Sequence, residues 1–502
     1  MSRQTDLDIA RDLAKRGEMD QAYVIADRYL KDDPNDVLFL TIMVYVMLDS
    51  DKTTVAYHLA KRVSDLAPKD PAVWVNFGMA CQDLWRSKEA ERAYKKGIAL
   101  VKKDQDQYSM LLVNLCALYI DIGLFDKAEP YAKQVLEVKP EHAKSIANLG
   151  FCQLAQRNWE EGWKNYRHCL GMSWRPQQRY MGEDEWEGQE VDTLVLYAEQ
   201  GLGDVISFAS LAEYAQTQCK KLILDVDPCL KNLFQRSFPK AKVYGTRGHK
   251  KLAWEKEDHK VDASLSIGQV AEYCRNKDSD FPGTAFLTPD PDRVFMWKQL
   301  FKSKNKPVIG LAWRGGIPKT GAKYRQWDLE QLHPLLSSID AHWVSLQYKP
   351  ASREIAEYLK NHPEIDLVEY PHATLTKDYD DTAALVKALD HVVCMQTAVT
   401  HLCGAMEVPC WTHIPINSQW RYGSDGEDFV WAKSVRLIRQ KKRGEWKEII
   451  KKTAGELCVL FPRVSKATGK AAQNGKVRSS GREILRSNDK SNSGQGADRP
   501  PA

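Results

Sequence analysis

The sequence predicts a multidomain protein of the α plus α/β class, in which an α-solenoid of helical hairpins precedes two α/β lobes. Two observations lead to this expectation. Small and aromatic residues recur at a nearly constant period in the first third of the chain, which is typical of helical repeat proteins. After about residue 190, short apolar runs alternate with amphipathic segments, which is typical of parallel sheets covered by helices.

The repeat is defined by a small residue that recurs with spacings of 34, 34, 38 and 34 residues. It stands at Ala22, Ala56, Ala90, Ala128 and Gly162. This period matches the tetratricopeptide signature, in which the small residue lets two antiparallel helices approach closely. We expect about five repeats in residues 1–170, with a concave surface for a protein partner or for self-association. An ordinary helical bundle is the alternative, and five matching units argue against it.

The alternation of apolar runs and amphipathic segments after about residue 190 predicts two Rossmann-like lobes with a cleft between them. The expected strands of the first lobe are Val191–Ala198, Leu222–Val226 and Lys242–Gly245. Those of the second are Val308–Trp313, Trp343–Gln347, Leu367–Tyr370, His391–Met395 and Cys410–Ile414. The expected division is therefore a linker at 171–190, an amino lobe at 191–290, a carboxyl lobe at 291–462 and a disordered basic tail at 463–502.

The net charge of +5 is a weak argument for nucleic-acid binding, because the tail alone carries +6 and the rest of the chain sums to about −1. Residues 463–502 carry nine Lys or Arg and three Asp or Glu, whereas a nucleic-acid-binding fold should show its basic excess on a folded face. The chain has neither an apolar leader nor an apolar run long enough to span a membrane, and we expect it to be cytoplasmic. Its 11 scattered cysteines predict reduced core residues and no metal site.

The first candidate loop follows the first strand of the amino lobe and opens a helix. It contains Gln200, Gly201, Gly203 and Asp204. Two glycines allow the backbone to come close to a ligand, and an acidic side chain can cap the helix. Asp204 can therefore be a catalytic group or only an N-cap. The loop is not a dinucleotide fingerprint, since the third glycine is missing.

The second candidate loop lies between a buried strand and a helix of the carboxyl lobe. It contains Gln396, Thr397, Thr400 and His401. Hydroxyl groups and free N–H groups at a helix amino terminus suit a diphosphate. The alternative is a threonine cap beside a packed histidine.

The third candidate loop is the glycine-rich segment from Arg314 to Arg325, which contains four basic residues. Such a loop at the carboxyl end of a strand can neutralise phosphate charge. A solvated surface loop explains the same composition.

Two other clusters carry weaker predictions. The run Asp378–Asp381 precedes a helix and is interpreted as capping charge rather than a metal site. Trp420–Tyr422 follows a loop and either lines the cleft or closes the lobe.

From Val191 to about Phe461 the chain resembles the glycosyltransferase domains that occur fused to tetratricopeptide repeats. It is similar to heptosyltransferases and, more distantly, to the protein O-linked N-acetylglucosamine transferases. The segments that carry the resemblance are YAEQGLGDVISFASL, VIGLAWRGG, WVSLQY, DDTAALVKALDHVVCMQTAVTHLCGAMEVPCW and QWRYG.

The resemblance implies a GT-B fold, a nucleotide-sugar donor held mainly by the carboxyl lobe, and inverting transfer without a metal or other cofactor. It implies Asp204 as the catalytic base, Arg325 near the donor phosphates and the Thr397–His401 segment at the diphosphate. Arg314 and Gln396 join the donor set, while Gln347 and Asp381 are possible cleft residues. Many relatives have Asp where this chain has Gln396, and a lysine where it has Arg325.

The predicted function is transfer of a sugar from a nucleotide-sugar to a protein, peptide or glycan acceptor, with the repeats recruiting the acceptor or a partner. Two alternatives stay open. The chain can be a non-catalytic scaffold that keeps the nucleotide-sugar-binding fold, which Gln396 favours, or another nucleotide-dependent enzyme on two lobes.

Overall fold

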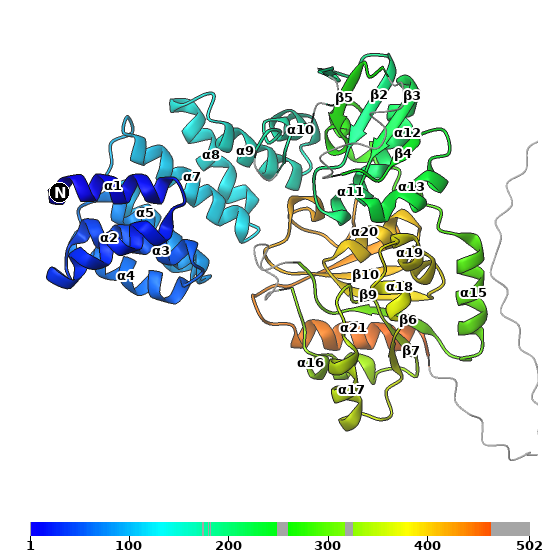
Figure 1. Ribbon diagram of the computed structural model, residues 1–502. Coiled ribbons are helices and arrows are strands. Elements are labelled where there is room, and N and C mark those ends of the chain that lie inside the picture. The colour runs from blue at the N-terminus through cyan, green and yellow to red at the C-terminus, as the bar shows by residue number, and fades with distance from the viewer. Residues whose placement is uncertain are drawn as a thin grey trace, which may run out of the picture. The chain divides into compact units, whose positions relative to one another are not determined.

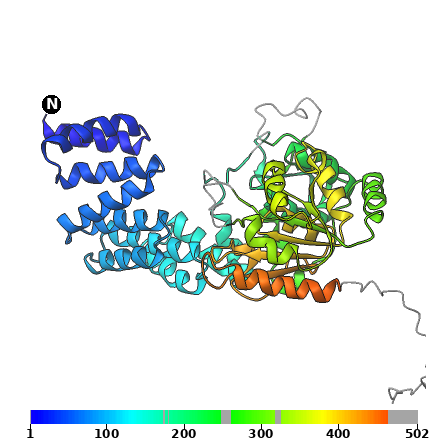
Figure 2. The same ribbon diagram turned by 90° about the horizontal axis from the view of Figure 1, so that it is seen from below.

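Five antiparallel helical hairpins form the first part of the chain (Figure 1). The structure is a computed structural model that describes residues 2–172, 175–178, 180, 182–247, 260–316 and 325–462. Successive hairpins lie side by side (Figure 2). Their helices are α1 (Arg3–Lys15), α2 (Met19–Asp32), α3 (Val37–Asp49), α4 (Thr53–Leu66), α5 (Pro71–Asp83), α6 (Ser87–Ala99), α7 (Asp106–Asp121), α8 (Phe125–Val138), α9 (Ala143–Ala155) and α10 (Trp159–Arg167).

The periodic small residues make the close helix contacts of the hairpins. Ala22, Ala56, Ala90 and Ala128 are fully buried. At the fifth position a Cβ on Gly162 would lie 2.7 Å from Leu154 Cδ2, so the α9–α10 pair has no room for a side chain there. The tetratricopeptide-like repeats predicted from the sequence are therefore present, together with the parallel α/β region described next.

The segment 171–190, expected from the sequence to be a linker, is partly built into the α/β fold. Its strand β1 (Asp184–Glu185) pairs in parallel with β5 (Ala263–Ser266). Trp186 is fully buried, and its indole N–H donates to the Gln189 carbonyl at 2.6 Å. The expectation of a simple linker was therefore wrong. This short polar stretch has no strand periodicity, so its sequence pattern could not predict the strand.

The amino lobe holds a five-stranded parallel sheet in the order β1-β5-β2-β3-β4. Its other strands are β2 (Val191–Tyr197), β3 (Cys219–Asp225) and β4 (Lys242–Tyr244). Its helices are α11 (Leu202–Phe208), α12 (Ala212–Thr217), α13 (Lys231–Ser237) and α14 (Ala271–Cys274).

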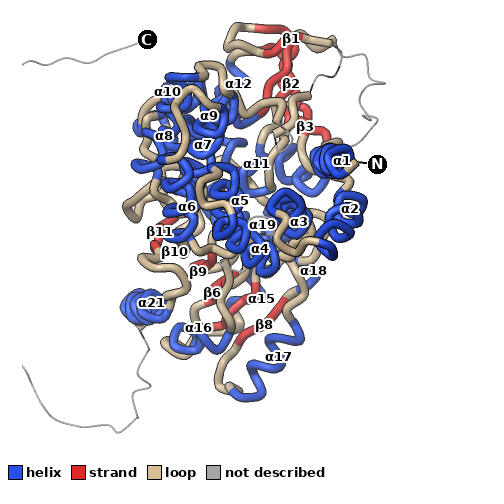
Figure 3. The backbone as a smooth tube through the Cα atoms, turned by 90° about the vertical axis from the view of Figure 1, so that its left-hand side faces the viewer, coloured by secondary structure: helices blue, strands red, loops and turns tan. Residues whose placement is uncertain are grey.

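The carboxyl lobe holds a six-stranded parallel sheet in the order β11-β10-β9-β6-β7-β8. Figure 3 shows β11, β10, β9, β6 and β8 following one another in this order. This is the strand order of dinucleotide-binding folds. Its strands are β6 (Val308–Ala312), β7 (His342–Ser345), β8 (Leu367–Glu369), β9 (His391–Met395), β10 (Cys410–Ile414) and β11 (Val435–Arg439). Its helices are α15 (Pro291–Lys302), α16 (Leu329–Leu336), α17 (Ser352–Asn361), α18 (Pro371–Thr374), α19 (Tyr379–Lys387), α20 (Ala398–Ala405) and α21 (Lys447–Leu460).

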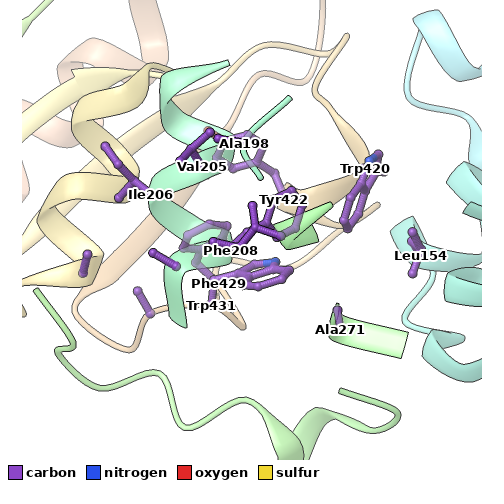
Figure 4. Close-up of a cluster of buried hydrophobic side chains, with 14 of the residues drawn as sticks. Leu154, Ala198, Val205, Ile206, Phe208, Ala271, Trp420, Tyr422, Phe429 and Trp431 are labelled. Atoms are coloured by element: carbon purple, nitrogen blue, oxygen red, sulfur yellow. The ribbon is translucent and has the colours of Figure 1, made fainter. Parts of the chain in front are cut away.

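One hydrophobic cluster runs without a break from the repeats through the amino lobe into the carboxyl lobe. Figure 4 shows part of it, with Phe208 of α11 beside Tyr422, Phe429 and Trp431 of the carboxyl lobe. The ring of Phe208 lies 5.5 Å from that of Trp431. No helix among the described residues has the length and apolar character needed to cross a membrane.

Candidate functional site

The three candidate loops lie at the carboxyl ends of the strands where each sheet reverses its winding direction. In the carboxyl lobe this point lies between β6 and β9, and in the amino lobe between β2 and β5. Ligands of open α/β sheets bind in the crevice outside the strands at such a point. The first loop follows β2, the third follows β6 and the second follows β9. The middle of the third loop, residues 317–324, lies outside the described residues.

A pocket of about 700 Å³ lies between the first loop, Arg325 at the end of the third loop, the segment 417–421 and the repeats, and no residue of the second loop lines it. Its repeat wall includes Asp51, Asp83, Trp85, Asp121 and Tyr166. Its lobe wall includes Gln200, Gly201, Asp204, Arg325, Trp420 and Arg421. The volume suits a ligand of cofactor size, and the charged lining suits a polar one.

Asp204 lies in the first turn of α11 and lines the pocket. Its Oδ2 accepts a hydrogen bond at 3.1 Å from the backbone N–H of Gly201, which is the N-cap residue. Asp204 therefore helps to cap the helix from the first turn, which is one of its two expected roles. Its Oδ1 forms an ion pair with Arg421 Nη2. Asp204 is thus both a cap and a pocket carboxylate, and it is already paired with a cation.

Arg421 comes from the carboxyl lobe and reaches Asp204 across the boundary between the lobes. Its side chain is 3% exposed and donates to Gln419 Oε1 at 2.7 Å. The Arg421 Nε has no hydrogen-bond partner among the described residues. Burial lowers the pKa of Arg421 from its usual range because the charged form loses its hydration.

Arg325 is a second buried cation on the pocket wall. It is 8% exposed, its Nε has no partner, and it pairs with no carboxylate of the described residues. Burial lowers its pKa as well. A buried guanidinium without a counter-ion is costly unless an anion completes the site, so the predicted phosphate role of Arg325 is consistent with its position.

Gln396 is a buried amide at the end of β9, where the carboxyl-lobe sheet reverses direction. It is 2% exposed, and neither its Oε1 nor its Nε2 finds a partner among the described residues. The neighbouring Thr397 is the N-cap of α20 and accepts from the Val399 N–H at 3.2 Å. A Cβ on Gly315 would lie 2.5 Å from Thr397 Cγ2, so the loops after β6 and β9 touch closely.

His401 forms hydrogen bonds to both lobes and does not line the pocket. Its Nδ1 lies 2.5 Å from Ser207 Oγ of α11, and its Nε2 lies 2.8 Å from the Tyr422 hydroxyl. Burial lowers the pKa of His401 to about 3, so it is neutral. The structure thus gives it the packed role, which is the alternative to the predicted diphosphate binding.

Thr400 and Gln347 also lie in packed surroundings. Thr400 is fully buried, and its Oγ1 accepts from the Thr412 hydroxyl at 3.1 Å. Gln347 is 1% exposed, and its amide oxygen accepts from the backbone N–H groups of Trp313 and Arg314 at 2.6 and 3.0 Å. Gln347 therefore shapes the start of the third loop, and neither residue lines the pocket.

Arg314 and Asp381 are each held by a partner outside the pocket. Arg314 Nη1 pairs with Glu354 Oε2 at 2.9 Å. Asp381 Oδ1 pairs with Arg293 Nη1 at 2.5 Å, and its Oδ2 accepts from Thr376 Oγ1 at 3.0 Å. The structure therefore ties the predicted cleft residue Asp381 to α15 instead of bringing it to the cleft.

Gln200 joins the amino lobe to the last hairpin. Its Nε2 donates to the Tyr166 hydroxyl at 2.7 Å. Beside it, Glu199 accepts from Arg175 Nε at 2.8 Å, in a pair whose side chains are 1% and 0% exposed. This buried ion pair fixes the first loop against the repeats.

Sequence reasoning missed the pairing of Arg421 with Asp204 and the buried pair of Arg175 with Glu199. It named Arg421 only as part of a segment that either lines the cleft or closes the lobe. No local signal could have identified either pair, because each joins residues that are distant in sequence and meet only in the folded chain.

One group among the described residues has the side chains of a metal site, and it is remote from the pocket lining. His333, His362 and Glu364 place ligand atoms within 4.8 Å of one another, near α16 and α17. His362 is also engaged by Glu330, whose Oε2 lies 3.0 Å from its Nε2. None of these residues lines the pocket.

Comparison with known proteins finds a relative that spans most of the chain. No protein-family model matches. Over 448 residues the chain is 26% identical to Protein FlbA of Caulobacter vibrioides (strain ATCC 19089 / CIP 103742 / CB 15), and the match covers 84% of this chain and 73% of the relative. That name states no activity.

Solved structures similar to this chain match its repeat part. MamA protein is 21% identical over 33% of this chain and 88% of its own, with a TM-score of 0.28. TTC0263, a thermophilic TPR protein in Thermus thermophilus, is 20% identical over 33% and 89%, with a TM-score of 0.30. YrrB, described as a TPR protein with an unusual peptide-binding site, is 16% identical over 32% and 82%, with a TM-score of 0.27.

Proposed function

We propose that the chain is a glycosyltransferase of the GT-B type that moves a sugar from a nucleotide-sugar to an acceptor presented by the repeats. The observation that supports this most directly is the composition of the pocket. One cavity combines a carboxylate at a helix start, Asp204, with a wall of repeat side chains and with a buried guanidinium, Arg325, that pairs with no carboxylate of the described residues.

The proposed reaction is inverting and needs no metal. The acceptor oxygen bonds to the anomeric carbon of the donor while the bond from that carbon to the diphosphate oxygen breaks. Asp204 takes the proton of the acceptor hydroxyl, and the departing diphosphate keeps the electron pair. Arg325 and the amino terminus of α20 stabilise the charge that develops on the diphosphate.

The repeats contribute to the same pocket, which supports a role in acceptor choice. Asp51, Asp83, Asp121 and Tyr166 belong to different hairpins or the turns beside them, and all line the cavity. A ligand in this cavity would touch both the repeats and the proposed catalytic lobe. We therefore propose that the acceptor is a protein, a peptide or a glycan carried by one, held against the repeat wall.

Two observations favour the alternative of a non-catalytic scaffold that binds a nucleotide-sugar. Asp204 is occupied by Arg421, and an amide stands at Gln396. Both alternatives share donor binding and differ in turnover, so one series of measurements separates them.

Thermal unfolding should be followed with UDP, GDP, ADP and CMP and with their common sugar conjugates. A ligand that binds only the folded state at 100 times its Kd stabilises it by about 2.7 kcal/mol. No shift with any of them at millimolar concentration would remove donor binding and both alternatives with it.

If a donor binds, Asp204→Asn is expected to lower transfer by at least about 100-fold, because a general base contributes roughly that much. Asp192→Asn is the matched control, since Asp192 is an exposed carboxylate that pairs with Lys220 and does not line the pocket. Donor binding with no detectable sugar transfer or donor hydrolysis in the wild type would support the scaffold, and unchanged turnover of Asp204→Asn would remove Asp204 as the base.

A further inference from the structure

We propose that Arg421 is a phosphate ligand and the positioning residue of Asp204, and that an arriving phosphate takes the guanidinium away from the carboxylate. The inference rests on the proposed function and deepens it. It assigns a residue to the donor phosphates and makes the freedom of the base depend on donor binding.

The ion pair of Asp204 and Arg421 lies at the pocket wall where the two lobes meet. Asp204 and Arg421 belong to different lobes, both line the pocket, and they are in direct ion-pair contact. The Asp204 side chain is 16% exposed, so the carboxylate has an open side toward the cavity. In this arrangement it acts as an internal anion that neutralises the guanidinium.

The guanidinium of Arg421 has N–H donors that its described partners do not use. A guanidinium offers five N–H donors. Arg421 uses Nη2 for Asp204 and for Gln419, while its Nε is buried without a partner. Among the described residues, Asp204 is the one carboxylate with which it pairs. A planar donor set with unfilled positions matches the bidentate geometry of a phosphate.

The cavity carries charged side chains on both of its walls. Arg325 lines the same pocket as a buried cation with no described carboxylate beside it. The two guanidiniums are buried on the lobe wall, and Asp204 is the described carboxylate in contact with one of them, whereas Asp51, Asp83 and Asp121 stand on the repeat wall of the same pocket. A diphosphate carries enough charge to neutralise both guanidiniums, and it would compete with Asp204 for Arg421.

Donor binding then has to precede the release of Asp204 from Arg421. Before the donor arrives, the carboxylate is held by Arg421 and is a poor proton acceptor, since a neighbouring cation stabilises its charged form. After the guanidinium turns to the phosphate, the carboxylate is free to accept the proton of the acceptor hydroxyl. The exchange makes and breaks no covalent bond, and it predicts that the donor binds before the acceptor.

The test measures binding of inorganic pyrophosphate and of UDP by titration calorimetry. The proteins are the wild type, Asp204→Asn, Arg421→Gln, the double variant and the control Asp51→Asn. Asp204→Asn should bind pyrophosphate about tenfold more tightly, because the internal competitor is gone. The gain should exceed that of Asp51→Asn, which removes an equal charge from the same pocket, and it should vanish in the Arg421→Gln background.

Arg421→Lys keeps the charge and gives a second variant should Arg421→Gln fold poorly by circular dichroism. In the Arg421→Lys background, Asp204→Asn should still tighten pyrophosphate binding, but by less than in the wild type. An ammonium group attracts phosphate by its charge and lacks the bidentate geometry of a guanidinium. A gain no larger than that of Asp51→Asn, or one that persists without Arg421, overturns the exchange. Absence of pyrophosphate, UDP and all other nucleotide binding in the wild type overturns the proposed function instead.

Discussion

Among the buried histidines of the carboxyl lobe, which also include His342, three have pKa values far below the usual range and are neutral rings in the folded protein. Burial lowers the pKa of His391 to about 4 and that of His401 and His413 to about 3. In the unfolded chain each returns to about 6.5. Between these values the unfolded state binds more protons than the folded state, so stability rises with pH.

We expect the free energy of unfolding to fall as the pH drops from 6.5 toward 4, by about 1.4 kcal/mol per pH unit for each histidine. His391→Phe should remove one such contribution. The phenyl ring can keep the edge contact with Trp411, at 4.6 Å between ring centroids, and the change removes an Nε2 for which the described part of the chain supplies no hydrogen-bond partner. Urea unfolding at pH 7, 6 and 5 measures the slope, and equal slopes for variant and wild type would contradict the assignment.

The pair of Arg175 and Glu199 is the most deeply buried of the described ion pairs at the repeat junction. Arg175→Met should cost about 3–5 kcal/mol, since it leaves Glu199 charged and buried without its partner. Adding Glu199→Gln should recover much of that loss. Denaturant unfolding of both variants gives the comparison. Lys164→Met, in an exposed pair with Glu160, is the control and should cost less than about 1 kcal/mol.

At the scale of elements, the contact between α11 and α20 decides how the two lobes meet. A Cβ on Gly203 would lie 2.7 Å from His401 Cδ2 and 3.2 Å from Ala398 Cα. The glycine is therefore needed for close helix approach across the lobe boundary. Its place in the first loop predicted close approach to a ligand, and the structure shows it packed against the other lobe.

Gly203→Ala should destabilise the protein by about 1–3 kcal/mol, because the added methyl group forces the two helices apart. The control is Gly455→Ala in α21, where an added Cβ meets nothing within 4 Å. That change should stabilise by up to about 1 kcal/mol through helix propensity. Thermal unfolding compares the two, and a neutral Gly203→Ala would mean that the helices are not in this contact.

Sequence patterns predicted the elements that are long or strongly apolar and missed those that depend on neighbours. The run Val308–Trp313 and the run His391–Met395 are continuous apolar segments, and they form β6 and β9. Three strands were missed. β1 and β5 have two and four residues, so neither could show a period, and in β11 two arginines interrupt the apolar residues. In the site, Gln200, Asp204 and Arg325 were placed on the pocket wall by strand-end rules, whereas Thr400 and Gln347 turned inward because tertiary packing decides side-chain direction.

At the scale of the whole molecule, the hairpins differ in their contacts with the rest of the structure. The last helix of the array, α10, packs on the amino lobe through Trp163, whose indole N–H donates to the Arg275 carbonyl at 2.8 Å. The first hairpin belongs to a separate hydrophobic cluster with α3 and α4. Stability in repeat arrays is a sum of local and nearest-neighbour terms.

We therefore expect amide hydrogen exchange to slow along the array, from α1 and α2 to α9 and α10. Regions with fewer buried contacts open more often, with free energies well below that of global unfolding. Exchange followed by mass spectrometry of peptic peptides measures this directly. Uniform protection of all five hairpins would show that the array unfolds as one unit with the lobes.

The shared pocket wall also limits which hairpins can be exchanged without touching the site. Its repeat residues begin at Asp51, after α3, so the first hairpin contributes none of them. A hairpin inserted between α4 and α5 would shift the carboxylate of Asp51 by a full repeat relative to Asp83 and Asp121. New hairpins added before α3 would lengthen the array and leave the lining intact. The chain thus has one end at which its recognition surface can grow, and a central part whose length is tied to the cavity.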